Sequence, residues 1–202
     1  MTSTRAARVT PLSQRRAEIL AIAAQLIATR GYSATTVRHV ADEAGILSGS
    51  LYHHFVSKES ILEELLRQFM TELLEGSERI ATGVGSPREV LDRLVDLSFH
   101  TIGTQPDLVR IYQQESEHVI AQPGFEFVAE YSTRMENIWL GAIRQGQQKG
   151  DFRDALDPSL TYRFIRDAVW ATARWFRPEG KHTTASLSAQ FRAFLHHGLL
   201  SD

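Results

Sequence analysis

The sequence contains no cysteine among its 202 residues. This absence excludes disulfide bonds, thiolate zinc sites and cysteine catalysis, and it is typical of proteins of the reducing cytoplasm. The chain also lacks an apolar run of about 18 residues, the length that predicts a membrane-spanning helix. Its opening residues, MTSTRAARVTPLSQRR, include no apolar stretch of the kind found in secretory signals. We therefore expect a cytoplasmic protein that makes no contact with a membrane.

Sequence motifs of enzymes are absent as well. The chain has no P-loop and no G-x-G-x-x-G nucleotide motif. The string GILSG does not match the nucleophile motif G-x-S-x-G, because its serine is displaced and a helix is predicted before it. The adjacent histidines His53 and His54, like His196 and His197, point about 100° apart on a helix and are poorly placed to chelate one metal. We predict a protein without catalytic residues, metal or cofactor.

Charge is distributed unevenly along the chain. The overall net charge is -2, but residues 1–58 hold seven basic and three acidic side chains, whereas residues 59–202 hold 15 basic and 21 acidic ones. A basic end joined to an acidic body is typical of a protein that docks one end on phosphate. Chance clustering in a basic tail would give the same imbalance, so the charge pattern alone leaves both interpretations open.

Helical periodicity accounts for nearly every segment. Apolar residues recur three and four positions apart, and glycine or proline closes each stretch. The Ser86-Pro87-Arg88-Glu89 string is typical of a helix start, with serine as the N-cap and glutamate three positions later. A further helix is expected to open at Pro158 and to stop before Pro178. No strand alternation is found, so we predict an all-α fold of about nine helices.

A helix-turn-helix is predicted between Thr35 and Glu59. The spacing predicts a helix from Val37 to Ala44, a turn at Gly45 and a short helix from about Ser48 to Phe55, with Leu51 and Phe55 facing inward. A helix placed this way enters the major groove of DNA. The candidate DNA-binding residues are Thr36, Ser48, Gly49, Ser50, Tyr52, His53, His54 and Lys58. Packing roles for the aromatic residues and a solvated role for Lys58 are the alternatives.

The string T-V-R-x-V-A-x-x-A-G followed by G-x-L-Y-x-H-F-x-x-K-E, residues 36–59, resembles the DNA-binding domain of the TetR family of bacterial repressors. The resemblance implies phosphate contacts by Thr36, Tyr52 and Lys58, and groove contacts by Ser48, Ser50 and His53. It also implies a helix-turn-helix domain over residues 1–58 and a helical effector-binding and dimerisation domain over residues 59–202. Many family members have a serine where this chain has Leu47, so either Ser48 caps the recognition helix or the turn is reshaped.

Three further strings, GILSGSLYHHF, YRFIRDAVW and RWFRPEG, are similar to an actinobacterial group of that family. This group represses cholesterol catabolism at the breakdown of the last two steroid rings. The similarity implies an effector that is a coenzyme A thioester of a ring-degradation intermediate.

A stripe of cations follows Pro158. Four arginines and one tryptophan share one predicted helix face: Arg163, Arg166, Trp170, Arg174 and Arg177. Arginine binds phosphate in a bidentate manner and tryptophan stacks on flat rings, so the stripe favours a phosphorylated ligand such as coenzyme A. Pairing of these arginines with Asp167, Glu179 or a partner subunit would explain it equally well. Weaker pocket candidates are Tyr112, Gln113 and Trp139.

Apolar residues of the last two predicted helices indicate a homodimer, in which two such helices from each subunit form a four-helix interface. They are Trp175, Phe176, Leu187, Phe191, Phe194 and Leu195. Such a dimer would read a palindromic operator. The sequence thus predicts a repressor released by an acyl-CoA effector, with the helix from about Lys58 to Ile80 as transmitter. A regulator of this type that senses a free hydrophobic drug or lipid is the main alternative, and a helical scaffold that binds no DNA is a remote one.

Overall fold

The computed structural model describes residues 11–199. Within that range the chain forms nine α-helices and one short 3-10 helix, which confirms the all-α prediction. The α-helices are α1 Pro11–Arg30, α2 Val37–Glu43, α3 Ser48–Leu51, α4 Lys58–Thr82, α5 Pro87–Thr104, α6 Pro106–Val119, α7 Glu126–Gln148, α8 Pro158–Ala171 and α9 Thr184–Leu199. None of these helices is long and apolar enough to cross a membrane.

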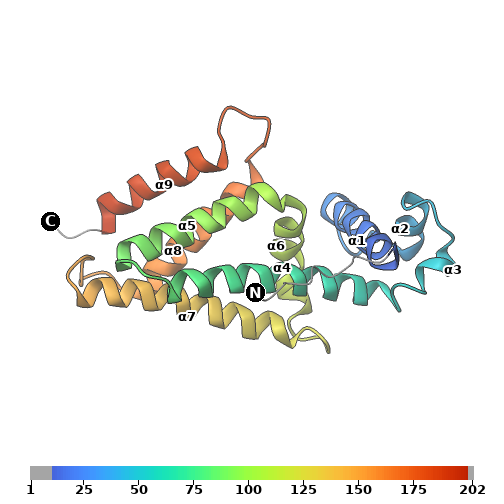
Figure 1. Ribbon diagram of the computed structural model, residues 1–202, viewed down its shortest axis with the longest axis horizontal. Coiled ribbons are helices and arrows are strands. Elements are labelled where there is room, and N and C mark those ends of the chain that lie inside the picture. The colour runs from blue at the N-terminus through green and yellow to red at the C-terminus, as the bar shows by residue number, and fades with distance from the viewer. Residues whose placement is uncertain (1–10, 200–202) are drawn as a thin grey trace, which may run out of the picture.

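The molecule is elongated, with two groups of helices joined by α4 (Figure 1). Helices α1, α2 and α3 lie at one end, and α5 to α9 form the rest of the body. Helix α4 begins beside the small N-terminal group and runs far into the body, and it packs against α1, α5, α6 and α7. The boundary predicted between residues 58 and 59 falls at the first turn of α4, and it remains a prediction because α4 belongs to both groups.

Local capping explains where several helices begin. The Thr36 hydroxyl accepts a hydrogen bond from the backbone N–H of His39, and the Ser57 hydroxyl accepts one from Ser60. The predicted start at Ser86 is confirmed, because its hydroxyl accepts from the N–H of Glu89 while the Glu89 carboxylate accepts from the N–H of Ser86. Each such cap satisfies backbone groups that the first turn of a helix leaves unpaired.

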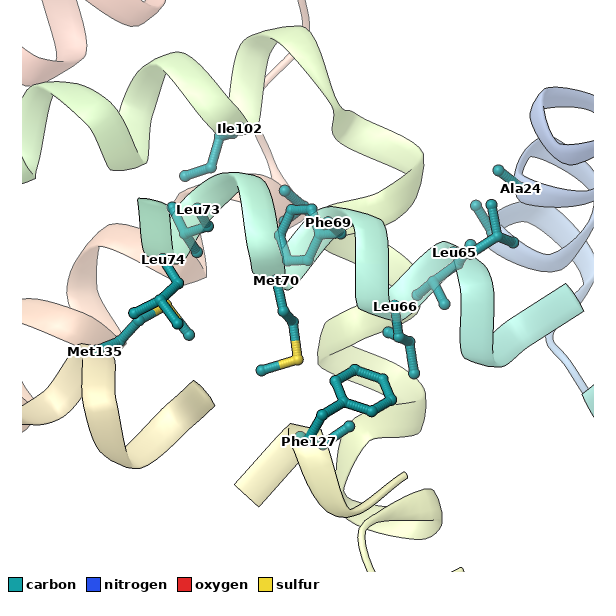
Figure 2. Close-up of a cluster of buried hydrophobic side chains, with 14 of the residues drawn as sticks. Ala24, Leu65, Leu66, Phe69, Met70, Leu73, Leu74, Ile102, Phe127 and Met135 are labelled. Atoms are coloured by element: carbon teal, nitrogen blue, oxygen red, sulfur yellow. The ribbon is translucent and has the colours of Figure 1, made fainter. Parts of the chain in front are cut away.

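The core of the molecule is built around α4. Figure 2 shows Ala24 of α1, Ile102 of α5 and both Phe127 and Met135 of α7 turned toward one face or another of α4. The α4 side chains that contact them are almost completely buried. They are Leu65, Leu66, Phe69, Met70, Leu73 and Leu74. Burying an aliphatic or aromatic side chain of this size contributes about 1.5–3 kcal/mol. Packing on several sides therefore holds α4 as one rigid element.

The end of α8 differs from the sequence prediction. The helix ends at Ala171, and a 3-10 turn from Thr172 to Arg174 follows it, so α8 stops before Pro178 but earlier than a continuous stripe as far as Arg177 requires. The buried Thr172 hydroxyl donates to the carbonyl oxygen of Val169 at 2.7 Å. A threonine that bonds a carbonyl three residues back competes with the regular helix pattern, and a tighter 3-10 turn commonly ends a helix.

Candidate DNA-binding surface and effector cavity

The predicted helix-turn-helix is formed by α2 and α3. Val40 and Ala41 of α2 are buried, as are Leu51 and Phe55 beyond the turn, so the inward face predicted from spacing is confirmed. Gly45 adopts a φ of +65°, a left-handed conformation that residues with a Cβ avoid. Its backbone N–H donates to the carbonyl of Asp42, and this closes α2 before the chain turns into α3.

The candidate DNA-binding residues on this motif are accessible. Thr36, Gly49, Tyr52 and His53 are exposed, and the remaining ones, Ser48, Ser50, His54 and Lys58, are half-buried. Thr36 uses its hydroxyl as the cap of α2, and a cap residue lies beside backbone N–H groups that favour an anion. Contacts of these residues with bases or phosphates remain predictions.

Lys58 is held by the loop that follows α1. Its Nζ donates to the backbone oxygen of Tyr32 at 3.1 Å and lies 4.1 Å from the centroid of the Tyr32 ring. The Tyr32 hydroxyl donates to Glu59 at 3.1 Å. Burial and the neighbouring Glu59 carboxylate together raise the pKa of Tyr32, so this hydroxyl stays protonated. The ammonium of Lys58 therefore has a defined position at the start of α4.

The start of α3 shows which residue occupies the N-cap position of the recognition helix. Leu47 itself occupies the N-cap position, and Ser48 is the first residue of the helix. Of the two alternatives at Leu47, the one in which Ser48 caps the recognition helix is therefore excluded. Among the described residues, no side chain provides a capping hydrogen bond to α3. The sequence Ile46-Leu47 simply offers no hydroxyl or carboxylate at that place.

A cavity of about 130 Å³ lies in the body, between α4, α5, α6, α7 and α8. Four of the predicted effector residues line it: Tyr112, Trp139, Arg166 and Trp170. Its other lining residues are Leu73, Ser77, Ser98, Ser132, Met135, Glu136, Tyr162, Ile165 and Val169. Burial raises the pKa of Tyr162 to about 12, so at neutral pH its hydroxyl is a hydrogen-bond donor. Most of the cavity wall is apolar, and its polar groups include hydroxyls, the Glu136 carboxylate and the Arg166 guanidinium.

A wider groove of about 720 Å³ adjoins this cavity. The two share Tyr112, Ser132, Arg166 and Trp170. The groove adds two predicted residues, Gln113 and Arg174, and also Glu117 and Asp167. Gln113 donates a hydrogen bond to the backbone oxygen of Trp170 at 2.8 Å and thereby joins α6 to the end of α8. The groove thus carries both cations and carboxylates.

The arginine stripe is not continuous as predicted, because α8 ends before Arg174. The lining that the structure describes for the cavity and the groove includes Arg166 and Arg174 but neither Arg163 nor Arg177. Arg177 donates to the backbone oxygen of its neighbour Phe176 at 2.9 Å. Arg166 pairs with Asp167 at 2.8 Å, as the alternative interpretation stated, and this contact raises its pKa.

Sequence reasoning missed several residues of the cavity wall, namely Ser77, Ser98, Ser132, Glu136 and Tyr162. The signal available was weak. Ser77 and Ser98 stand on the apolar faces of α4 and α5, where a serine replaces an expected aliphatic residue. Both hydroxyls donate to a carbonyl oxygen four residues back, at 2.8 and 2.9 Å, so each is satisfied within its own helix. Such serines are common in helices, and only the packing of five helices reveals a cavity beside them.

The predicted dimerisation residues divide into two groups. Trp175 and Phe194 are exposed. Phe176, Leu187, Phe191 and Leu195 pack against the core, and the Phe191 ring lies 5.8 Å from that of Phe99 on α5. The structure adds two exposed apolar residues of α8 that sequence reasoning did not select, Leu160 and Phe164. The free apolar surface of this region therefore belongs to α8 and α9 together.

Two descriptions of protein families match the chain. "Bacterial regulatory proteins, tetR family" matches residues 19–65, and "Tetracyclin repressor-like, C-terminal domain" matches residues 84–199. Together they cover the helix-turn-helix and the body that holds the cavity.

Named relatives are similar over almost the whole chain. The HTH-type transcriptional repressor KstR2 of Rhodococcus jostii is 44% identical over 190 residues, which are 94% of this chain and 93% of that protein. KstR2 of Mycobacterium tuberculosis is 41% identical over 191 residues, 95% of this chain and 96% of that protein. The solved structure titled ketosteroid transcriptional regulator KstR2 of Mycobacterium tuberculosis matches with a TM-score of 0.91 and 41% identity, over 93% of this chain and 96% of that one.

These matches confirm the resemblance drawn from residues 36–59 and from the three shorter strings, and they confirm that the protein is not an enzyme. The chain belongs to the TetR family of bacterial regulatory proteins, as a transcriptional repressor closely related to the KstR2 proteins.

Proposed function

We propose that this repressor binds a palindromic operator as a homodimer and is released by a coenzyme A thioester formed in steroid catabolism. The observation that carries the proposal is the continuity between an apolar cavity and a groove that contains arginines, with Arg166 and Trp170 in both. A thioester of this kind has the same two parts, an apolar ring system and a long phosphorylated nucleotide.

The cavity suits the apolar part of such a ligand. Leu73, Met135, Ile165 and Val169 supply apolar wall, while the Tyr162 hydroxyl and the Glu136 carboxylate can bond polar substituents of a ring. At about 130 Å³ the cavity alone is smaller than the sites that hold drug-sized ligands, which are about 300–1,000 Å³. The effector therefore has to extend into the groove.

The groove suits the nucleotide part. Arg166 and Arg174 can each bind phosphate oxygens, and Trp170 offers a ring on which an adenine can stack. Arg110 and Arg174 also line a neighbouring hollow of about 290 Å³, which extends the cationic surface along α6. The relative from Mycobacterium tuberculosis is named a ketosteroid transcriptional regulator, and this name supports a steroid-derived effector.

Release of DNA requires that the effector prefer a conformation that the operator disfavours. Helix α4 contributes Leu73 and Ser77 to the cavity and begins at Lys58 beside the recognition helix. We infer that ligand binding moves α4 and so changes the spacing of the two recognition helices of a dimer. A preference of the effector for the released state by a factor of about 100 corresponds to about 2.7 kcal/mol.

The test is fluorescence anisotropy of the purified protein on DNA from upstream of its own gene, with added steroid-derived thioesters. We expect tight, salt-sensitive binding that a thioester abolishes and the free acid does not. Equal release by the free acid would favour a sensor of a hydrophobic drug or lipid. Tight binding that no thioester changes would remove the proposed effector and leave the repressor.

Three variants locate the effector. Arg166→Ala and Trp170→Ala should retain operator affinity but require at least about tenfold more thioester for half-release, because each removes a contact with a charged or stacked group. Arg163→Ala is the matched control, since Arg163 is an exposed arginine of the same helix outside the cavity lining. Normal release from both test variants would move the effector site elsewhere.

A further inference from the structure

Leu47 projects from the turn that joins α2 and α3. Its backbone is extended, with φ -68° and ψ 142°, and 80% of its surface is exposed. It directly precedes Ser48, the first residue of α3. Scattered exposed leucines are ordinary on protein surfaces, so exposure alone does not give Leu47 a role.

The position makes the residue informative. A serine, threonine, aspartate or asparagine at the N-cap would stabilise the following helix, and α3 is only four residues long. Leucine provides no cap there, and it also leaves a large apolar side chain in water. Both local stability and solubility favour a polar residue at this position, so an interaction outside the isolated chain is needed to explain leucine.

Leu47 is followed by residues with small side chains. Ser48, Gly49 and Ser50 leave the exposed Leu47 as the large apolar side chain at the start of α3. Residues at the beginning of a recognition helix contact base edges in the major groove. An aliphatic side chain cannot form hydrogen bonds with phosphates or base edges, but it packs well against the C5 methyl group of thymine, the one apolar group that the major groove presents.

We propose that Leu47 determines part of the operator sequence by packing on a thymine methyl group in each half-site. The inference rests on operator binding through α3. It adds a base preference that none of the predicted serine and histidine contacts supplies, because those side chains read hydrogen-bonding groups.

The test begins with duplexes selected by the full-length protein from a random library. Each thymine of the selected duplex is then replaced singly by deoxyuridine, which lacks only the methyl group, and affinity is measured by anisotropy. For the unchanged protein we expect one position per half-site at which the replacement weakens binding about fourfold, the value for one buried methyl-sized group. For Leu47→Ala we expect weaker binding to the thymine duplex and no further loss with deoxyuridine at that position.

Two variants serve as controls. Leu47→Met keeps a long apolar side chain and should retain the response to deoxyuridine. Val84→Ala removes an equally exposed apolar group from the loop after α4 and should bind as the unchanged protein does. If Leu47→Ala binds tightly and shows the same deoxyuridine profile as the unchanged protein, the role of Leu47 is overturned, but operator binding is not. Selection of no duplex at all would overturn operator binding, and this inference with it.

Discussion

At the scale of single residues, the cationic and phenolic groups near α3 are expected to determine how strongly the protein binds phosphate. Lys58 is the first residue of α4, and its ammonium lies against the Tyr32 backbone and ring. We predict that Lys58→Ala weakens binding to all DNA sequences and lowers the slope of log affinity against log salt by about 0.9, the value for one phosphate contact. Measurement of operator affinity across a salt series checks this.

Lys149→Ala provides the control for charge, because Lys149 is an exposed lysine at the end of α7. Circular dichroism of Lys58→Ala is needed as well, since that variant also loses its contact with Tyr32. An unchanged salt slope in a folded Lys58→Ala protein would contradict the assignment.

Tyr52 is predicted to act through its hydroxyl. The side chain lies at the C-cap of the recognition helix α3 and is 54% exposed. We expect Tyr52→Phe to lose about 0.5–1.5 kcal/mol of operator affinity without a change of sequence preference, because a phosphate contact carries no base information. Competition between the operator and random DNA measures both quantities. A loss confined to the operator would indicate a base contact instead.

The Glu59 carboxylate makes folding stability depend on pH. It accepts hydrogen bonds from its own backbone N–H, from the Ser57 hydroxyl and from the Tyr32 hydroxyl, and these contacts lower its pKa. A lowered pKa in the folded state means that the stabilisation is present above the unfolded pKa of about 4.3 and is lost as the pH falls through the folded value. We predict that Glu59→Gln flattens the pH dependence of the unfolding free energy on this acidic side.

Urea unfolding at several pH values between 3 and 7 measures this effect. Glu75→Gln is the control, because Glu75 lies on the same helix and makes only an exposed pair with Arg79 at 3.7 Å. Identical pH profiles for Glu59→Gln and the unchanged protein would exclude the proposed contribution.

At the scale of elements, α6 offers a second connection between the cavity and the DNA-binding end. Tyr112 of α6 lines the cavity. On the same helix, Glu115 accepts a hydrogen bond from the backbone N–H of Tyr32 at 3.4 Å, and Arg110 donates to the Ala28 oxygen of α1 at 3.4 Å. Tyr32 is also the residue on which Lys58 rests. We therefore expect a movement of α6 to be transmitted through Tyr32 to the start of α4.

We predict that Glu115→Ala weakens the coupling between the two sites. The variant should bind the effector as before, but saturating effector should lower operator affinity by a factor several times smaller than in the unchanged protein. Paired titrations of operator with and without effector give this ratio, and Glu75→Ala is the control. An unchanged ratio would leave α4 as the connection supported by the packing.

The elements themselves were largely predictable from the sequence. Capping at Thr36, Ser86 and Asp157 depends on residues within a few positions of each other, and such local signals are visible in the sequence. The end of α8 was not, because the hydroxyl of Thr172 ends it inside an otherwise helical pattern. The cavity was predicted only in part, since Tyr112 and Trp170 are distant in sequence and their meeting depends on how the helices pack.

At the scale of the whole molecule, the exposed apolar surface on α8 and α9 is the expected dimer interface. Phe164 is 71% exposed and Phe194 76% exposed, Leu160 is also exposed on α8, and Trp175 is exposed just after the 3-10 turn that follows α8. Patches of this kind on a folded protein mark interaction sites. We predict that Phe164→Glu and Phe194→Glu each shift the protein toward monomer and weaken operator binding at least about tenfold, because each half-site then binds separately.

Analytical ultracentrifugation measures the association. Val84→Glu is the control, a charge placed on a fully exposed apolar residue outside this surface. By contrast, Phe191→Ala should lower the free energy of unfolding, because its ring packs on Phe99 inside the subunit. A stable dimer in both Phe164→Glu and Phe194→Glu would place the interface on another face.

The length of α4 determines how far Lys58 moves when the helix tilts at the cavity. From Ser77, at the cavity, to Lys58, at the first turn, the helix rises about 28 Å. A tilt of about 4° about the cavity end displaces Lys58 by about 2 Å, a distance that breaks hydrogen bonds. Under the proposed release mechanism, we therefore expect that a ligand needs to shift the cavity wall by only a fraction of an ångström. Substitutions that bend α4 between Ser77 and Lys58 should reduce this displacement of Lys58 while leaving both binding sites intact.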